Sequence, residues 1–298
     1  AALPLEGPDF THLVTEALKR ALADREAYYG DAPEAAGPLT LAPDYLRERR
    51  AQIAGTAGAT LDPGKIPGFE TQRAAALARN AWLAGRQVHS GPGVGEPTMG
   101  HLKKPGDTVH LDVVDRWGNM VSATPSGGWL QSSPVVPGLG MPLNSRAQMF
   151  WLDEGLPTSL YPGRRPRTTL SPSMARAPDG TRLAYGTPGG DQQDQWQTAF
   201  ILRLIHHGLN LQEAIDAPLF HTDHLQASFD PHGFTPAHLL LEPAFPPATI
   251  EALKAMGHRV QVSAPWSAGR LTAVSRRPDG LLRAAATPRL MQAYAAGR

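Results

Sequence analysis

A threonine that opens a strand directly after a flexible linker has the clearest chemical potential in this sequence. Thr108 follows Pro105, Gly106 and Asp107. A threonine hydroxyl is a weak nucleophile unless a base takes its proton, and the free α-amine of an N-terminal threonine is such a base. Cleavage of the Asp107–Thr108 bond would create that N-terminus. The pattern alone leaves a second interpretation open, because threonine is also a common strand residue.

Other catalytic motifs are absent from the sequence. It has no Gly-x-Ser-x-Gly nucleophile elbow, no His-Glu-x-x-His zinc helix and no Walker phosphate loop. The chain has no cysteine, which excludes disulfide bonds, thiol catalysis and thiolate metal sites. The spacing from His221 to His224 suits a metal. Without an obvious third ligand, however, we expect structural histidines there and no metal site.

Composition and charge exclude several classes of protein. With 298 residues, 41% hydrophobic and 18% charged, the chain is globular and long enough for one or two domains. A net charge of +1 gives no reason to expect a nucleic-acid partner. No apolar run approaches the roughly 20 residues of a transmembrane helix, so we expect no membrane span. The start at Ala1, without Met or a signal-peptide pattern, indicates a mature or truncated piece. The compartment stays open, with the cytoplasm slightly favoured.

The elements that position Thr108 can be predicted from periodicity. Residues 1–88 favour three helices, one stopping at Gly30, one running from Pro43 to Gly55, and one capped by Thr71. Residues 89–106 are rich in glycine and proline and are typical of a linker.

From residue 108 onward the pattern changes to strands and helices. Residues 108–115 and 120–124 alternate across a turn and predict a hairpin. Residues 125–172 show little periodicity and predict ordered loops. A strand over 183–187 precedes a helix that ends at Gly208, and Asn210 with Glu213 frames a short capped helix. A further helix closes at Gly257, and strands follow over 259–262, 271–276 and 281–285. This order favours an α+β layered domain.

Four segments resemble, in the same order, the γ-glutamyltransferase (γ-glutamyltranspeptidase) family. They are Gly106-Asp107-Thr108-Val109-His110 with the hairpin that follows, Arg165-Pro166 through Leu170-Ser171-Pro172, Gly186-Thr187-Pro188-Gly189-Gly190, and Leu209-Asn210 through Pro218. In the family these are the processing site, the serine-pair segment, the glycine-pair segment and the helix after it. The likeness covers residues 108–298 and extends into residues 1–107.

The resemblance implies an N-terminal-nucleophile hydrolase fold, an αββα sandwich with two stacked antiparallel sheets between helix layers. It implies a proenzyme that cuts itself before Thr108. Residues 108–298 would then be the small catalytic subunit, and residues 1–107 the helical end of the large subunit plus a linker. Most of the large subunit, with the family arginine that binds the substrate carboxylate, would be missing. The implied partners are a small-molecule amide and the other processed subunit, in a heterodimer that could dimerise further.

The resemblance also assigns roles to single residues. Thr108 would attack the amide carbonyl and form an acyl-enzyme. The backbone N–H groups of Gly189 and Gly190 would stabilise the oxyanion. Ser126 stands where the family has a threonine that helps to activate the nucleophile.

The substrate-carboxylate site and the amino-group site differ in how far they depart from the family. Thr168 and Thr169 stand in place of the serine pair that holds the substrate carboxylate, so a hydroxyl remains at each position. The glutamyl amino group is held in the family by three residues. Gly128 stands in place of an Asn, Arg146 in place of a Gln or Glu, and Met149 in place of an Asp. An ammonium would lose its carboxylate and face a guanidinium, which instead prefers an acid. We therefore expect an acyl group that lacks the amino group or carries an extra acid. The other interpretation of Arg146 is a surface salt bridge.

The resemblance thus predicts an autoprocessed γ-glutamyl-type amide hydrolase or acyltransferase that needs no cofactor. Two alternatives remain open. One is an amidohydrolase or acylase for a non-glutamyl amide, such as a dicarboxylic one. The other is a family member that binds small acids without turnover.

Overall fold

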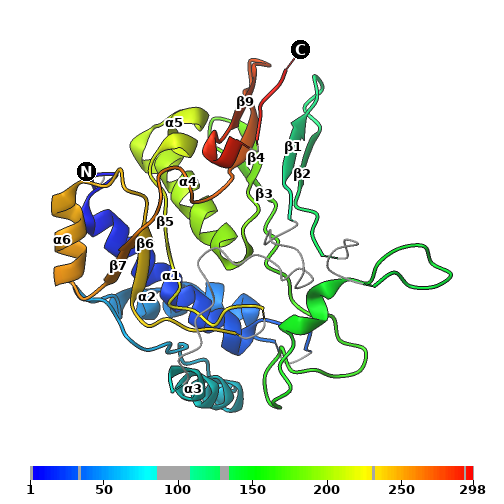
Figure 1. Ribbon diagram of the computed structural model, residues 1–298, viewed down its shortest axis with the longest axis vertical. Coiled ribbons are helices and arrows are strands. Elements are labelled where there is room, and N and C mark those ends of the chain that lie inside the picture. Colours follow the sequence, from blue (N-terminus) through cyan, green and yellow to red (C-terminus); the bar gives the residue numbers. More distant parts are fainter. Residues whose placement is uncertain are drawn as a thin grey trace.

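The computed structural model describes residues 3–32, 35–85, 108–127, 134–229, 232–291 and 293–297. Its α-helices are α1 (Pro8–Tyr28), α2 (Pro43–Ala51), α3 (Glu70–Ala84), α4 (Gln193–His207), α5 (Leu211–Asp216) and α6 (Pro247–Ala255). Its strands are β1 (Leu111–Val114), β2 (Met120–Ala123), β3 (Ser173–Arg176), β4 (Arg182–Gly186), β5 (Phe220–Thr222), β6 (His238–Leu241), β7 (Arg259–Val262), β8 (Thr272–Arg276) and β9 (Leu282–Ala286). In Figure 1 the helices α1–α3 lie at the end of the molecule away from the β1–β2 hairpin and the C-terminus.

The N-terminal region forms the three predicted helices, with corrected ends. Helix α1 begins at Pro8 and ends at Tyr28, just before Gly30. Helix α2 begins at the predicted Pro43 but stops at Ala51, short of Gly55, because its last turn closes with the Gln52 N–H donating to carbonyl groups of that turn. No helix within the described ranges is both long and apolar enough to cross a membrane.

The predicted cap of α3 is wrong. The helix begins at Glu70, with Phe69 as its N-cap, and Thr71 lies inside its first turn. The chain reverses at Gly68, where φ is +85°. The Gly68 N–H then donates to Glu70 Oε1 at 3.1 Å. This turn starts the helix two residues before a threonine cap would allow.

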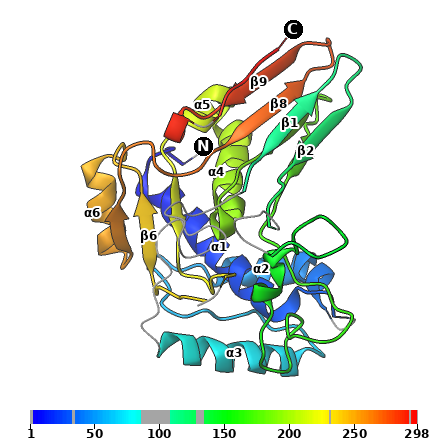
Figure 2. The same cartoon turned by 45° about the vertical axis from the view of Figure 1, so that its right-hand side comes forward.

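Two antiparallel sheets surround the residues expected to do the chemistry. Strands β1 and β2 form the predicted hairpin, with Val113 opposite Val121. Strands β3, β4, β8 and β9 form an antiparallel four-stranded sheet in that order. Figure 2 shows β9, β8, β1 and β2 running side by side along one end of the molecule.

The faces of β4 show how the layers stack. Because side chains alternate along a strand, Tyr185 and Gly186 point to opposite faces of the sheet. Tyr185 contacts Phe200 of α4, with ring centroids 5.3 Å apart. A Cβ added to Gly186 would collide with the His110 ring beside β1. Helix α4 therefore covers one face of the sheet and the hairpin packs on the other, in agreement with the predicted layers.

A third sheet was not predicted. Strands β5 and β6 pair antiparallel, while β6 and β7 pair parallel. All three residues of β5 are buried, and so are three of the four residues of β6. A strand buried on both faces has no alternation to reveal it. Of this sheet, only the range of β7, residues 259–262, was predicted.

Candidate active site

The expected nucleophile lies at the open end of the β1–β2 hairpin. Antiparallel pairing brings the residue before β1 next to the residue after β2. The Val109 N–H donates to the Pro125 carbonyl at 3.2 Å. Thr108 Oγ1 and Ser126 Oγ form a hydrogen bond of 2.6 Å. Two residues expected at the site from sequence are thus in direct contact.

A buried polar chain lies under this threonine, and the sequence reasoning missed it. His110 Nδ1 contacts Thr124 Oγ1 at 2.7 Å, and its Nε2 contacts Asp112 Oδ2 at 3.0 Å. The side chains of His110 and Asp112 are both only 1% exposed. Thr272 Oγ1 of β8 donates to the same carboxylate oxygen at 2.7 Å. The alternation of β1 places both residues on its inner face, a signal that could have identified them.

The expected oxyanion glycines connect β4 to α4. Gly189 has φ +141° and Gly190 has φ +58°. A Cβ at Gly189 would collide with Trp196 of α4. Only glycine satisfies both the conformation and the close approach. Thr187, the residue after β4, holds the start of this loop in place, because its hydroxyl donates to the Pro188 carbonyl at 2.7 Å.

Asp191, directly after the glycine pair, is the centre of a buried charge network. Arg25 of α1 contacts it at 3.0 Å, and the Ser228 N–H donates to it at 2.7 Å. Burial alone would raise the pKa of this carboxyl, but Arg25 and Arg167 hold it below its usual value. Arg167 also donates to Ser228 Oγ at 2.7 Å. The network joins α1, the expected oxyanion loop and the segment that leads to Thr168.

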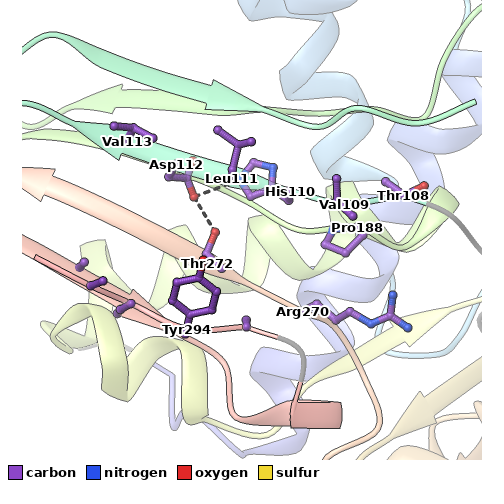
Figure 3. Close-up of a pocket in the computed structure, with 15 residues that line it drawn as sticks. Thr108, Val109, His110, Leu111, Asp112, Val113, Pro188, Arg270, Thr272 and Tyr294 are labelled. Carbon is purple, nitrogen blue, oxygen red and sulfur yellow. Dashed lines mark hydrogen bonds and ion pairs between the residues drawn. The ribbon is translucent and has the colours of Figure 1, made fainter.

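A cavity of about 410 Å³ opens beside Thr108. Figure 3 shows Thr108 and Pro188 at the same end of it, with the guanidinium of Arg270 at that end as well. Tyr294 and the neighbouring alanines of the C-terminal segment also line the cavity. The sequence reasoning did not identify Arg270.

The remaining predicted substrate residues lie outside this cavity lining. Thr169 is buried, whereas Thr168 is exposed and accepts a hydrogen bond from the Leu170 N–H at 3.1 Å. Arg146 is only 4% exposed, so the interpretation as a surface salt bridge is wrong. Its guanidinium lies 5.5 Å from the centroid of the Phe229 ring. The structure does not bring Thr168, Thr169 or Arg146 into contact with Thr108.

Several predictions fall outside the described residues. Asp107, Gly128 and the linker over 89–106 are among them. Met149, which replaces the family aspartate, is described and is 1% exposed.

The histidines with metal-like spacing have other partners. Asp223 pairs with His238 at 2.9 Å and lies 3.9 Å from His221. His224 instead accepts from the Ala237 N–H at 2.8 Å. The expected structural role therefore accounts for the described geometry.

Among the residues that the structure describes, His12, Glu16 and His258 also have ligand-like geometry. His12 Nδ1 and His258 Nε2 already share a hydrogen bond of 2.8 Å. Glu16 is paired with both Lys19 and Arg20. Hydrogen bonds and ion pairs explain this cluster without an ion.

Comparisons with known proteins agree with the fold. The family model described as Gamma-glutamyltranspeptidase matches residues 2–297. The chain is 39% identical over 190 residues to an oxamate amidohydrolase proenzyme of Klebsiella pneumoniae subsp. pneumoniae, covering 63% of this chain and 35% of that protein. It is 34% identical over 281 residues to the acylase ACY 1 proenzyme of a Pseudomonas species, covering 93% of this chain and 42% of that protein.

A solved structure of LmbA2991HD superposes with a TM-score of 0.81 at 47% identity, covering 100% of this chain and 50% of that one. The chain thus spans half the length of that solved chain and less than half the length of the two curated relatives just described. The fold is the expected N-terminal-nucleophile hydrolase fold. With the family match extending over nearly every residue, the chain belongs to the γ-glutamyltranspeptidase family.

Proposed function

We propose that this chain is the catalytic part of an autoprocessed amide hydrolase or acyltransferase whose nucleophile is Thr108. The observation that carries the proposal is the 2.6 Å hydrogen bond between Thr108 and Ser126 at the mouth of a cavity that Pro188 also lines. The cleavage would divide the protein into residues 108–298 and a large subunit that ends with residues 1–107. The two subunits would stay together as a heterodimer, since Arg25 and Asp191 form a buried ion pair across this division.

Maturation would follow from the same hydroxyl. Thr108 Oγ attacks the Asp107 carbonyl carbon, and the C–N bond breaks as the acyl group moves from nitrogen to oxygen. This shift frees the Thr108 amine, which keeps the hydroxyl proton, and water then hydrolyses the ester to give the Asp107 α-carboxylate and the free Thr108 hydroxyl. Ser126 would orient the hydroxyl through its hydrogen bond.

Turnover would use the freed amine as the base. It takes the Thr108 hydroxyl proton as Oγ attacks the substrate amide carbon, and returns that proton to the leaving amine. The N–H groups of Gly189 and Gly190 would stabilise the negative oxygen of the tetrahedral intermediate. Water or an amine then attacks the resulting ester and regenerates Thr108.

The acyl group is proposed to differ from ordinary γ-glutamyl. Arg146 and Met149 are buried, and by the sequence resemblance they stand at positions that hold the glutamyl ammonium in the family. Neither side chain can accept a hydrogen bond from an ammonium as a carboxylate would. The curated relatives include an acylase proenzyme and an oxamate amidohydrolase proenzyme, and the second name specifies an amide that is not γ-glutamyl. We propose an acyl group without the amino group, and Arg146 as a residue that favours an acid on it.

Intact mass spectrometry of the full-length proenzyme tests the proposal. We expect two subunits, the smaller beginning at Thr108, and a single uncut chain for Thr108→Ala. Glutaryl, succinyl and γ-glutamyl 4-nitroanilides then define the acyl group, with the glutaryl or succinyl amide preferred. An uncut wild-type chain, or Thr108→Ala with full activity, would overturn the proposed nucleophile. Such an uncut, inactive wild type would favour a family member that only binds small acids.

A further inference from the structure

Arg270 is held at the end of the cavity where the reaction would occur. It lies between β7 and β8, two residues before β8 begins. Its backbone N–H donates to Thr187 Oγ1 at 2.9 Å, which ties it to the loop that carries Pro188 and the glycine pair. In Figure 3 its guanidinium and the Thr108 hydroxyl both project toward the same end of the cavity.

Arg270 differs from two arginines of the fold that are paired with buried carboxylates. Arg25 is paired with Asp191, and Arg289 is paired with Glu242 at 2.7 Å. In the described part of the chain, no carboxylate lies within ion-pair distance of Arg270. Burial is what lowers the pKa of this guanidinium, with no charged neighbour raising it. Because Arg270 is half-buried, its guanidinium is partly desolvated, and a ligand that supplies an anion would offset that cost.

The carboxylate in the described part of the cavity lining is hydrogen-bonded through one of its two oxygens. It belongs to Asp112, whose Oδ2 accepts from both His110 and Thr272. This carboxylate therefore holds the hairpin to β8 and does not form an ion pair with Arg270. The guanidinium is left as the cationic group of a cavity whose volume of about 410 Å³ suits a small molecule.

We propose that Arg270 is the anion-binding residue of the Thr108 cavity and that it takes a carboxylate of the amide substrate. A guanidinium matches a carboxylate through two parallel hydrogen bonds, which fixes orientation as well as charge. Because Arg270 and Thr108 share one end of the cavity, this carboxylate lies close to the bond that is cleaved. The inference rests on the proposed function, with Thr108 as nucleophile. Arg270 would act as a specificity-determining residue.

Matched pairs of substrates test the inference on the processed full-length enzyme. Glutaryl and butyryl 4-nitroanilides differ in a carboxylate on the acyl part, and butyryl 4-aminobenzoate and butyryl anilide differ in one on the amine part. In one of these two pairs the carboxylate is the one that Arg270 binds. For that pair, Arg270→Gln should lower kcat/KM of the acidic substrate roughly 10- to 100-fold. It should lower kcat/KM of the neutral substrate less than about 3-fold. Arg270→Lys should fall between. The pair that responds identifies the part of the substrate that carries the acid.

Arg283 of β9 provides the matched control, because it is an exposed arginine outside the cavity lining. Arg283→Gln should leave both members of each pair unchanged. Equal losses for acidic and neutral substrates in Arg270→Gln, or no loss, would overturn the inference. If Arg270→Gln does not mature, inhibition of the wild-type enzyme by glutarate and glutaramide decides. At least about tenfold stronger inhibition by glutarate supports the inference, and equal inhibition overturns it.

These outcomes separate the inference from the proposed function. Suppose that the wild-type enzyme is cut before Thr108, that Thr108→Ala is inactive, and that the wild type hydrolyses acidic and neutral amides equally well. The proposed function would then stand, and the proposed anion site would be refuted. An enzyme whose activity survives Thr108→Ala loses the proposed nucleophile, whatever its charge preference.

Discussion

The two segments that meet at the candidate site are held in place in opposite ways. The loop after β4 is fixed by buried charge. Asp191 pairs with Arg25 of α1, a residue 166 positions away, and accepts from the Ser228 backbone. The network reaches Thr168 and Thr169 through Arg167. Moving this loop would break several charged contacts at once.

The β1–β2 hairpin, in contrast, is fixed on one face only. Val109, Leu111, Val113 and Val121 are each between 44% and 52% exposed on its outer face. Its inner face is held by hydrogen bonds around Asp112, with Thr272 as the contact to β8. The expected nucleophile therefore sits on the more lightly anchored segment and the expected oxyanion groups on the rigid one. Substitutions should cost much more in the second segment than in the first.

Asp191→Ala should have the largest effect. It removes one of the two carboxylates that pair with the Arg25 guanidinium, the other being Glu26, and breaking a buried pair in this way costs about 3–5 kcal/mol, a large part of a domain's stability. The free energy of unfolding in urea measures the loss. Asp279→Ala removes an exposed carboxylate that pairs with Arg277 at 3.4 Å, and should change stability by less than about 1 kcal/mol. Similar losses in both variants would contradict the buried network as the anchor.

Gly189→Ala should reduce both stability and activity. The new methyl group meets Trp196, and φ of +141° is costly for alanine, so we expect a loss of roughly 1–3 kcal/mol and displaced backbone N–H groups. The change in kcat should exceed tenfold, as removing an oxyanion donor does. Gly280→Ala is the control, since Gly280 also has positive φ, at +88°, but has open space around it. Normal kcat in Gly189→Ala would refute the role of this loop.

Acid should destabilise the fold where buried histidines lie close to α1, as His258 does through its hydrogen bond with His12. Burial lowers the pKa of His258 to about 4 and of His224 to about 3. Unfolded histidine titrates near 6.5, so between about pH 6.5 and 4 the unfolded chain binds more protons than the folded one. The free energy of unfolding should therefore fall as pH falls through this window, by up to about 3 kcal/mol for each of the two histidines.

Urea unfolding at steps of pH measures this loss, and a variant identifies its source. His258→Gln should flatten the dependence, because a neutral amide replaces a group that the folded state keeps neutral. His206→Gln changes an exposed histidine of α4 and should leave the dependence unchanged. Identical slopes in both variants would show that other groups cause the acid sensitivity.

Local patterns in the sequence were sufficient for the elements that frame the site. Alternation identified the β1–β2 hairpin. The short helix α5 was predicted from Asn210 and Glu213, and the structure has both reciprocal hydrogen bonds, at 3.0 and 2.9 Å. Both signals lie within a few residues of each other. Local propensity and helix capping therefore determine the hairpin and α5 without help from tertiary contacts.

Contacts between distant residues could not be predicted in the same way. The pairing of Arg25 with Asp191 and the placement of Arg270 beside Thr108 depend on the packed fold. Strands β5 and β6 are short and buried, so they lack a period to detect. Arg146 was expected either at the surface or in the site, and burial excluded the first without testing the second.

Thr272→Val should have the smallest effect and is the sharpest test of the lightly anchored segment. It removes the hydroxyl that donates to Asp112 at 2.7 Å while keeping the shape of the side chain. Because one neutral donor to a carboxylate is lost and His110 still contacts Asp112, we expect about 0.5–1.5 kcal/mol. Thr181→Val is matched, since Thr181 donates to Asp179 at 3.0 Å in an exposed turn, and it should cost less. If Thr272→Val destabilises as much as Asp191→Ala, the hairpin is as firmly anchored as the loop. If kcat then also falls with no change in KM, the hydrogen bond positions Thr108 rather than merely holding the sheet.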